Sequence, residues 1–154
     1  MMGIAALFAA MPAHAALDPA KPIEQHTQRV WESDAALPQS GLPQNSVLAI
    51  AQGSEGYLWI GTEAGLARFD GVRFRAFTSE NTPELHSEAI RALLVDSHNN
   101  LWIGTYGGGL VLYRDEKFLT FPAYEKLSAN VIHAFYEDGN GTLWICSDNG
   151  GLIR

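Results

Sequence analysis

Basic residues and cysteine are both scarce in this sequence. Ten Lys and Arg stand against seventeen Asp and Glu, which gives a formal net charge of −7. Phosphate backbones and anionic membranes are bound by clustered cations, so this composition predicts no nucleic-acid partner and no direct binding to a membrane surface. The single cysteine, Cys146, excludes an internal disulfide and any zinc site with several cysteine ligands.

Charge of either sign is also low. Charged residues make up 18% of the 154 residues and hydrophobic residues 47%, whereas soluble domains carry about 25% charged residues. This excludes a disordered acidic tail, and the length is sufficient for one domain with a hydrophobic core.

The first seventeen residues contain no charged side chain. Ile4–Met11 is apolar and is followed by Ala13-His14-Ala15, which predicts a signal peptide over residues 1–15 and export to the periplasm. The alternative is a buried or frayed N-terminal helix. Residues 16–40 then form an N-terminal entry segment. Within it, Val30-Trp31 is a candidate strand that could complete the last sheet of a repeat fold.

An internal repeat is the main feature of the chain. Leu58-Trp59-Ile60-Gly61 recurs at 101–104 and again at 143–146, where Cys146 replaces the glycine. The tryptophans lie 43 and 42 residues apart. Each has an alanine ten residues before it, a hydroxyl residue three residues after it, and a Gly-Leu pair downstream. Such self-similarity is typical of repeat architectures.

Each repeat predicts four short strands separated by Gly-, Asn- and Asp-rich turns. The first strand is continuously apolar, which predicts burial on both faces. Asp70-Gly71 is a strong signal for a tight hairpin before the fourth strand, and Asp115-Glu116 is a weaker one. The predicted strands of the first repeat are Val47–Ala51, Leu58–Gly61, Leu66–Phe69 and Arg73–Phe77.

Four strands in about 40–45 residues is the period of a β-propeller blade. The predicted fold is therefore all-β, with four-stranded antiparallel blades, about three of them, in an incomplete propeller. The blades are repeat 1 at 41–83, repeat 2 at 84–126 and a partial repeat 3 at 127–154. The expected role of the repeated aromatics is to fill the space between sheets. They are Trp59, Trp102, Trp144, Phe77 and Phe121.

The stretch GLPQNSVLAIAQGSEGYLWIGTEAGLARFDGVRFRAF, Gly41 to Phe77, resembles the two-component regulator propeller repeat. The resemblance extends over roughly residues 28–154 in three copies. It implies an extracytoplasmic sensor module of a bacterial signalling protein, usually followed by an immunoglobulin-like domain, a membrane helix and a histidine kinase or diguanylate cyclase.

No kinase, cyclase or nucleotide-binding motif occurs in the chain. Because a propeller typically needs about 4–8 blades to close, we expect a fragment that is not an enzyme, whose partners are the missing blades and signalling domains of the same protein. The membrane would be reached only through that missing part.

The loops between the second and third strands should open on one rim of the propeller, where a small-molecule or glycan ligand is expected. The polar residues there are Glu63, Tyr106, Asp148 and Asn149. Glycines 107–109 either let a ligand approach the backbone or only make a tight turn. No cofactor and no metal site are predicted, because the histidines lack ligand spacing.

Two alternatives from other classes remain open. A lyase of the streptogramin-lyase type would need a histidine and a carboxylate on the rim, for which His86 and Glu88 are the candidates. A protein-interaction scaffold would need only an exposed apolar patch.

Overall fold

The structure is a computed structural model that describes residues 29–33, 41–122, 127 and 130–154. The chain divides into two units, residues 1–30 and residues 31–154. Of the first unit only Arg29 and Val30 are described, so the predicted signal peptide lies outside the described residues.

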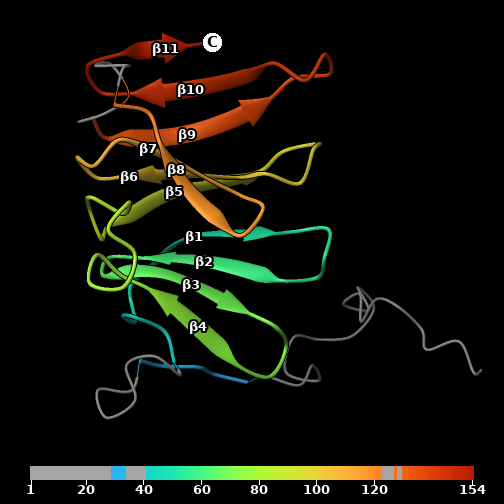
Figure 1. The fold of residues 1–154 in the computed structure, drawn as a ribbon, viewed down its shortest axis with the longest axis vertical. Helices are drawn as coiled ribbons and strands as arrows, with labels where there is room; N and C mark the ends of the chain where they lie inside the picture. Colours follow the sequence, from blue (N-terminus) through green and yellow to red (C-terminus); the bar gives the residue numbers. More distant parts are fainter. Residues whose placement is uncertain (1–28, 34–40, 123–126, 128–129) are drawn as a thin grey trace, which may run out of the picture. The chain divides into compact units, whose positions relative to one another are not determined.

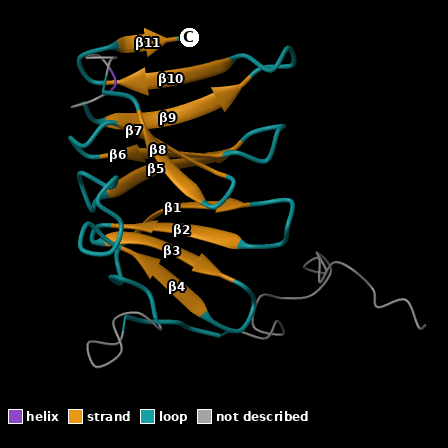
Figure 2. Ribbon diagram, in the orientation of Figure 1, coloured by secondary structure: helices purple, strands orange, loops and turns teal. Residues whose placement is uncertain are grey.

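The strands of the described part form three antiparallel sheets that follow one another along the chain (Figures 1 and 2). Within each sheet, strands adjacent in sequence are adjacent in space and antiparallel, which confirms the predicted antiparallel blades. Among the described residues there is no helix with the length and hydropathy needed to cross a bilayer. The strands are β1 (Val47–Gln52), β2 (Leu58–Thr62), β3 (Gly65–Phe69) and β4 (Phe74–Phe77); β5 (Ile90–Val95), β6 (Leu101–Thr105), β7 (Leu110–Arg114) and β8 (Lys117–Thr120); and β9 (Ile132–Glu137), β10 (Leu143–Ser147) and β11 (Gly151–Ile153).

The hydrophobic core lies between successive sheets. We call the face of a sheet that meets the preceding sheet its N-side face, and the opposite face its C-side face. Trp59 and Phe77, on the C-side face of the first sheet, are buried against Ile103 of the second sheet. Trp102 and Phe121 stack with ring centroids 6.0 Å apart beside the second core, and Trp144 is half-buried.

We call the strand that comes first in each sheet, β1, β5 or β9, its innermost strand. A β-bulge lies at the start of each of these strands. The strand register shifts around one extra residue, which is Leu48, Arg91 or His133. Side chains alternate between the two faces of a strand. An extra residue therefore changes the face on which the residue before the bulge lies. Ile90 and Ile132 are thereby aimed at the preceding sheet and are fully buried, whereas the bulge residues are exposed.

The expected burial of the first strands on both faces is wrong. In β1, Val47 and Ile50 are exposed. In β9, every residue except Ile132 is at least partly accessible to solvent. An innermost strand pairs with one strand only, and no described sheet covers the N-side face of β1.

Both expected fourth-strand hairpins form, and the one with the weaker signal has the more regular turn. In the second repeat, Arg114 pairs with Lys117, and both intervening residues have positive φ, 50° at Asp115 and 58° at Glu116, as a two-residue type I′ turn requires. In the first repeat, the equivalent Asp70 backbone N–H donates to the Arg73 carbonyl oxygen at 3.2 Å. The Asp70 carboxylate also accepts hydrogen bonds from the backbone N–H groups of Val72 and Arg73, which stabilises the turn.

Trp31 covers part of the N-side face of the first sheet. Its ring contacts Phe69 edge-on at 5.2 Å, and Trp59 contacts Tyr113, the counterpart of Phe69 in the next repeat, in the same way at 4.9 Å. Trp31 thus occupies the place that the tryptophan of a preceding blade would take. The described residues 29–33 form no strand.

Aspartates organise the turn between the first two strands in the second and third repeats. One Asp96 carboxylate oxygen accepts hydrogen bonds from the backbone N–H groups of His98 and Asn100. The other accepts a hydrogen bond of 2.9 Å from the Trp102 indole N–H. Asp138 holds Trp144 in the same way at 3.0 Å. The pKa of Asp138 is lowered, chiefly by the hydrogen bond from Trp144. Burial raises the pKa of Asp96, but hydrogen bonds led by those from Asn100 outweigh it and the net shift is downward.

Acidification is therefore expected to destabilise the chain. A carboxyl group with a lowered pKa in the folded state contributes stability that is present above its unfolded pKa, about 4. That contribution is lost as the pH falls through the lower folded value. Urea unfolding between pH 7 and pH 3 should show a falling midpoint, and Asp96→Asn should flatten this fall while lowering the midpoint at pH 7. An unchanged pH dependence in Asp96→Asn would contradict the role of this carboxylate.

Candidate functional site

The predicted rim is formed at one end of all three sheets. The turns after β2, β6 and β10 lie at this end, on the left in Figure 1, together with the connections that lead into β5 and β9. All four residues predicted to bind a ligand are exposed there. They are Glu63, Tyr106, Asp148 and Asn149.

The rim backbone is held in the same way in each repeat. Backbone N–H groups of Glu63, Tyr106 and Asp148 donate to the carbonyl oxygens of residues 46, 89 and 131, at 3.2, 2.9 and 3.2 Å. The buried hydroxyl of Thr105 donates to the Gly109 carbonyl at 2.8 Å, and that of Thr62 closes the equivalent turn. Three different side chains therefore project from one fixed backbone geometry.

The bulge residues lie beside the predicted ones. The Arg91 guanidinium lies 4.9 Å from the centre of the Tyr106 ring. His133 Nε2 lies 2.5 Å from Asp148 Oδ1, and both side chains are about half-exposed. The structure thus pairs Arg91 with Tyr106 and His133 with Asp148, which adds two residues that the sequence analysis did not place at the rim. The available signal was a polar residue in second place within an otherwise apolar strand.

The glycines at 107–109 serve the fold. Gly107 and Gly109 have φ values of 86° and 78°, which disfavour other residues. A Cβ atom on Gly108 would lie 2.7 Å from the backbone nitrogen of Ser87. The turn interpretation accounts for all three residues.

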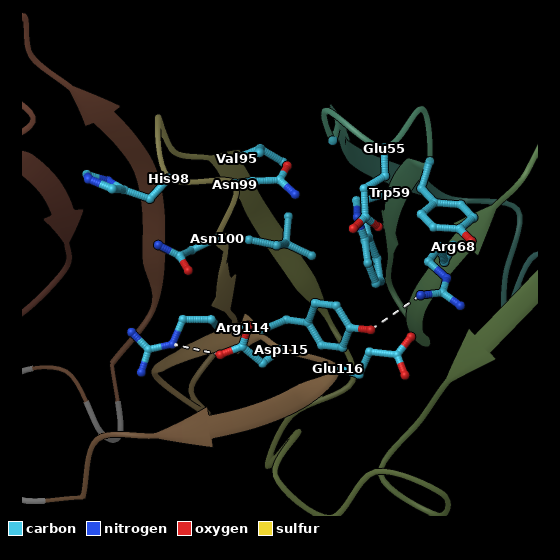
Figure 3. A pocket seen from close by; sticks show the side chains of 14 residues that line it. Glu55, Trp59, Arg68, Val95, His98, Asn99, Asn100, Arg114, Asp115 and Glu116 are labelled. Atoms are coloured by element: carbon cyan, nitrogen blue, oxygen red, sulfur yellow. Dashed lines mark hydrogen bonds and ion pairs between the residues drawn. The ribbon is translucent and has the colours of Figure 1, made fainter.

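A pocket at the opposite end of the sheets was missed by the sequence analysis. It has a volume of about 490 Å³ and lies between the first and second sheets (Figure 3). Arg68 lies 4.4 Å from the centre of the Tyr57 ring and donates a hydrogen bond of 3.3 Å to the Tyr113 hydroxyl. Burial raises the pKa of Tyr113, against the opposing charge of Arg68. Glu55 and Glu116 add carboxylates to the lining.

The two residues considered for lyase chemistry, His86 and Glu88, belong to no metal-binding cluster in the part of the chain that the structure describes. His86 lines a cavity of about 200 Å³ with Gly108 and Phe121. Glu88 accepts a hydrogen bond of 2.5 Å from the Ser79 hydroxyl. Within the described residues, no three His, Cys, Asp or Glu side chains come close enough together to hold a metal ion.

Comparison with known proteins places these sheets in a family. The model of the two component regulator propeller matches residues 41–64, 84–107 and 126–149. A histidine kinase of Formosa agariphila is 47% identical over 47 residues, covering 30% of this chain and 3% of that protein. The chain therefore spans only a small part of this relative.

Solved propeller structures agree with the fold. The extracellular domain of a hybrid two component system from B. thetaiotaomicron is 25% identical, with a TM-score of 0.66, over 80% of this chain and 17% of that chain. Virginiamycin B lyase from Staphylococcus aureus is 14% identical, with a TM-score of 0.54, over 80% of this chain and 39% of that chain; this likeness shows the fold alone. Three propeller sheets, each matched by the same repeat, show that the chain belongs to the two component regulator propeller family.

Proposed function

We propose that this chain is part of an extracytoplasmic, ligand-sensing propeller of a bacterial signalling receptor, and that it binds a ligand without catalysing a reaction. The full receptor would be a sensor histidine kinase or a diguanylate cyclase. The support is the membership of the family, the match to a histidine kinase, and the likeness to the extracellular domain of a hybrid two component system.

One observation carries the assignment of the site to the rim. The backbone at positions 63, 106 and 148 is fixed by equivalent hydrogen bonds, while the exposed side chains are a carboxylate, a phenol and a second carboxylate. A rigid scaffold that presents variable side chains is the usual arrangement of a binding surface. The pairs Arg91–Tyr106 and His133–Asp148 add a guanidinium and an imidazole. These groups suit a hydroxyl-rich or acidic ligand such as a glycan.

The test is binding to an array of neutral and acidic oligosaccharides, with the chain labelled at its single cysteine. We expect saturable binding to a subset of the array. The double variant Tyr106→Ala, Asp148→Ala should bind about tenfold or more weakly, equivalent to about 1.4 kcal/mol, with an unchanged thermal midpoint. Val72→Ala, an exposed change at the opposite end of the first sheet, is the matched control.

One result would contradict the rim assignment, and another would contradict the ligand class. Binding that survives the double variant but is lost in Arg68→Ala would move the site to the pocket of Figure 3. No binding to any sugar on the array would remove glycans as the ligand class.

A further inference from the structure

The two interfaces between sheets share the same kind of contact, an isoleucine packed against a glycine. An isoleucine at the start of an innermost strand lies over the glycine of L-W-I-G in the preceding sheet. A Cβ atom on Gly61 would lie 2.7 Å from Ile90 Cγ2, and one on Gly104 would lie 2.7 Å from Ile132 Cγ2. Both isoleucines are 0% exposed. Since real Cβ atoms do not approach so closely, each isoleucine requires the glycine beneath it.

The third sheet breaks this rule. Its residue equivalent to Gly61 and Gly104 is Cys146, so the place that accepts an isoleucine in the other two sheets already holds a side chain. The thiol is a small apolar group, not a bulky one. Even so, its Cβ alone fills the space that Ile90 and Ile132 use.

The C-side face around Cys146 is an uncovered counterpart of the two interfaces. Leu152 is 64% exposed, whereas its equivalent in the first sheet, Leu66, is 0% exposed. Tyr136 is also exposed, and with Trp144 and Cys146 it lines an apolar groove of about 540 Å³. In the first and second sheets, the same positions are covered by the next repeat.

We propose that this face binds a further propeller repeat whose innermost strand begins with glycine, where β5 and β9 begin with isoleucine. The Cβ atoms of Ile90 and Ile132 themselves lie 3.0 and 2.8 Å from the Cβ positions on Gly61 and Gly104, so even alanine would be too large there. Cys146 then acts as a specificity determinant. It accepts that repeat and rejects repeats with isoleucine or valine at the same position.

The chain's own first sheet belongs to the rejected class. Val47 is the counterpart of Ile90 and Ile132, and it is 47% exposed on the N-side face of the first sheet. A second copy that docked through this face would bring Val47 onto Cys146. Specificity here comes from an unfavourable contact with the wrong partner as well as a favourable one with the right partner.

The test uses the full chain extended after Arg154 by a second copy of residues 113–154, which continues the repeat in register because Arg154 corresponds to Leu112. In the appended copy, Cys146→Ser leaves a single thiol in the extended chain. One form keeps Ile132 in the appended copy, and the other carries Ile132→Gly there. Docking is measured by the rate of reaction of Cys146 with Ellman's reagent and by hydrogen exchange of residues 143–153.

In the Ile132→Gly form, Cys146 should react at least tenfold more slowly than in the 154-residue chain. In the form that keeps Ile132, its rate should stay within about twofold of that chain. Adding Cys146→Gly in the original copy of the Ile132 form recreates the Gly–Ile pair seen twice, so hydrogen exchange of β10 should then slow. This control shows that the appended repeat folds.

Three results would overturn the proposal. The first is equal protection of Cys146 in the Ile132 and Ile132→Gly forms, which would deny selection by side-chain size. The second is an absence of docking in the Ile132→Gly form or in the Cys146→Gly control, which would deny that the face binds a repeat. The third is loss of thiol reactivity with rising concentration in the 154-residue chain, which would place a second copy on the face.

Discussion

Replacing Leu85 by alanine is expected to lower the free energy of unfolding by about 2–5 kcal/mol, as for large-to-small changes in other protein cores. Leu85 lies in the connection between β4 and β5 and is fully buried in the first core with Trp59 and Ile90. Its backbone N–H is held by the Thr82 carbonyl at 3.0 Å, so the loop cannot easily close over a cavity. Urea unfolding monitored by tryptophan fluorescence measures the change.

The matched control for Leu85→Ala is Val72→Ala, which removes an apolar side chain that is 83% exposed. Its effect should stay within about 0.5 kcal/mol. Equal effects of the two substitutions would contradict the placement of the loop leucine between the sheets.

Gly104→Ala is expected to destabilise the chain by about 1–3 kcal/mol, although alanine normally suits a strand better than glycine. The new methyl group would lie 2.7 Å from Ile132 Cγ2 and 2.8 Å from Ile132 Cβ. These atoms are close to the backbone and cannot move aside as the end of a long side chain would. The strain therefore has to be taken up by separating the second and third sheets.

A double-mutant cycle isolates this contact. Ile132→Ala alone should cost about 2–5 kcal/mol through the cavity it leaves. In that background the contact with Cγ2 is gone, while the Cβ atom of residue 132 still lies 2.8 Å from the new methyl group. Gly104→Ala should therefore cost less than in the original chain, with a coupling energy of about 0.5–3 kcal/mol. Additive effects would show that Gly104 and Ile132 do not share the space between the sheets.

The strands and the core were predictable because the repeat aligns three independent copies. Trp59, Trp102 and Trp144 mark the second strand of each sheet, and the strands predicted for the first repeat agree with β1 to β4 to within one residue at each end. The apolar character of the first strand misled the expectation of burial, since Val47 and Ile50 are exposed. Composition alone does not say which faces have a neighbouring sheet.

Features that depend on one extra residue were not predictable. The bulges at Arg91 and His133 decide that Ile90 and Ile132 face the preceding sheet. The one local signal, a polar residue in second place, is absent from the first sheet, where the bulge residue is Leu48. The hairpin at Asp115-Glu116 takes positive φ at both residues because the pairing of Arg114 with Lys117 leaves only two residues for the turn. Tertiary pairing overrides local propensity there.

The sequence predicted where the four candidate rim residues lie, but not which other side chains lie beside them. Spacing after L-W-I-G places Glu63, Tyr106 and Asp148 at one rim, as found, but Arg91 and His133 arrive there only through the bulges. The pocket around Arg68 joins residues from two repeats, a contact that depends on how the sheets stack.

The most direct test of the central claim, that this chain is part of a sensor propeller in a signalling receptor, is to sequence the gene through codon 154 and the codons that follow. The account predicts an open frame that continues into further L-W-I-G repeats, a membrane helix and a histidine kinase or diguanylate cyclase. A stop codon directly after codon 154, in a gene that yields a stable protein of this length, would contradict it.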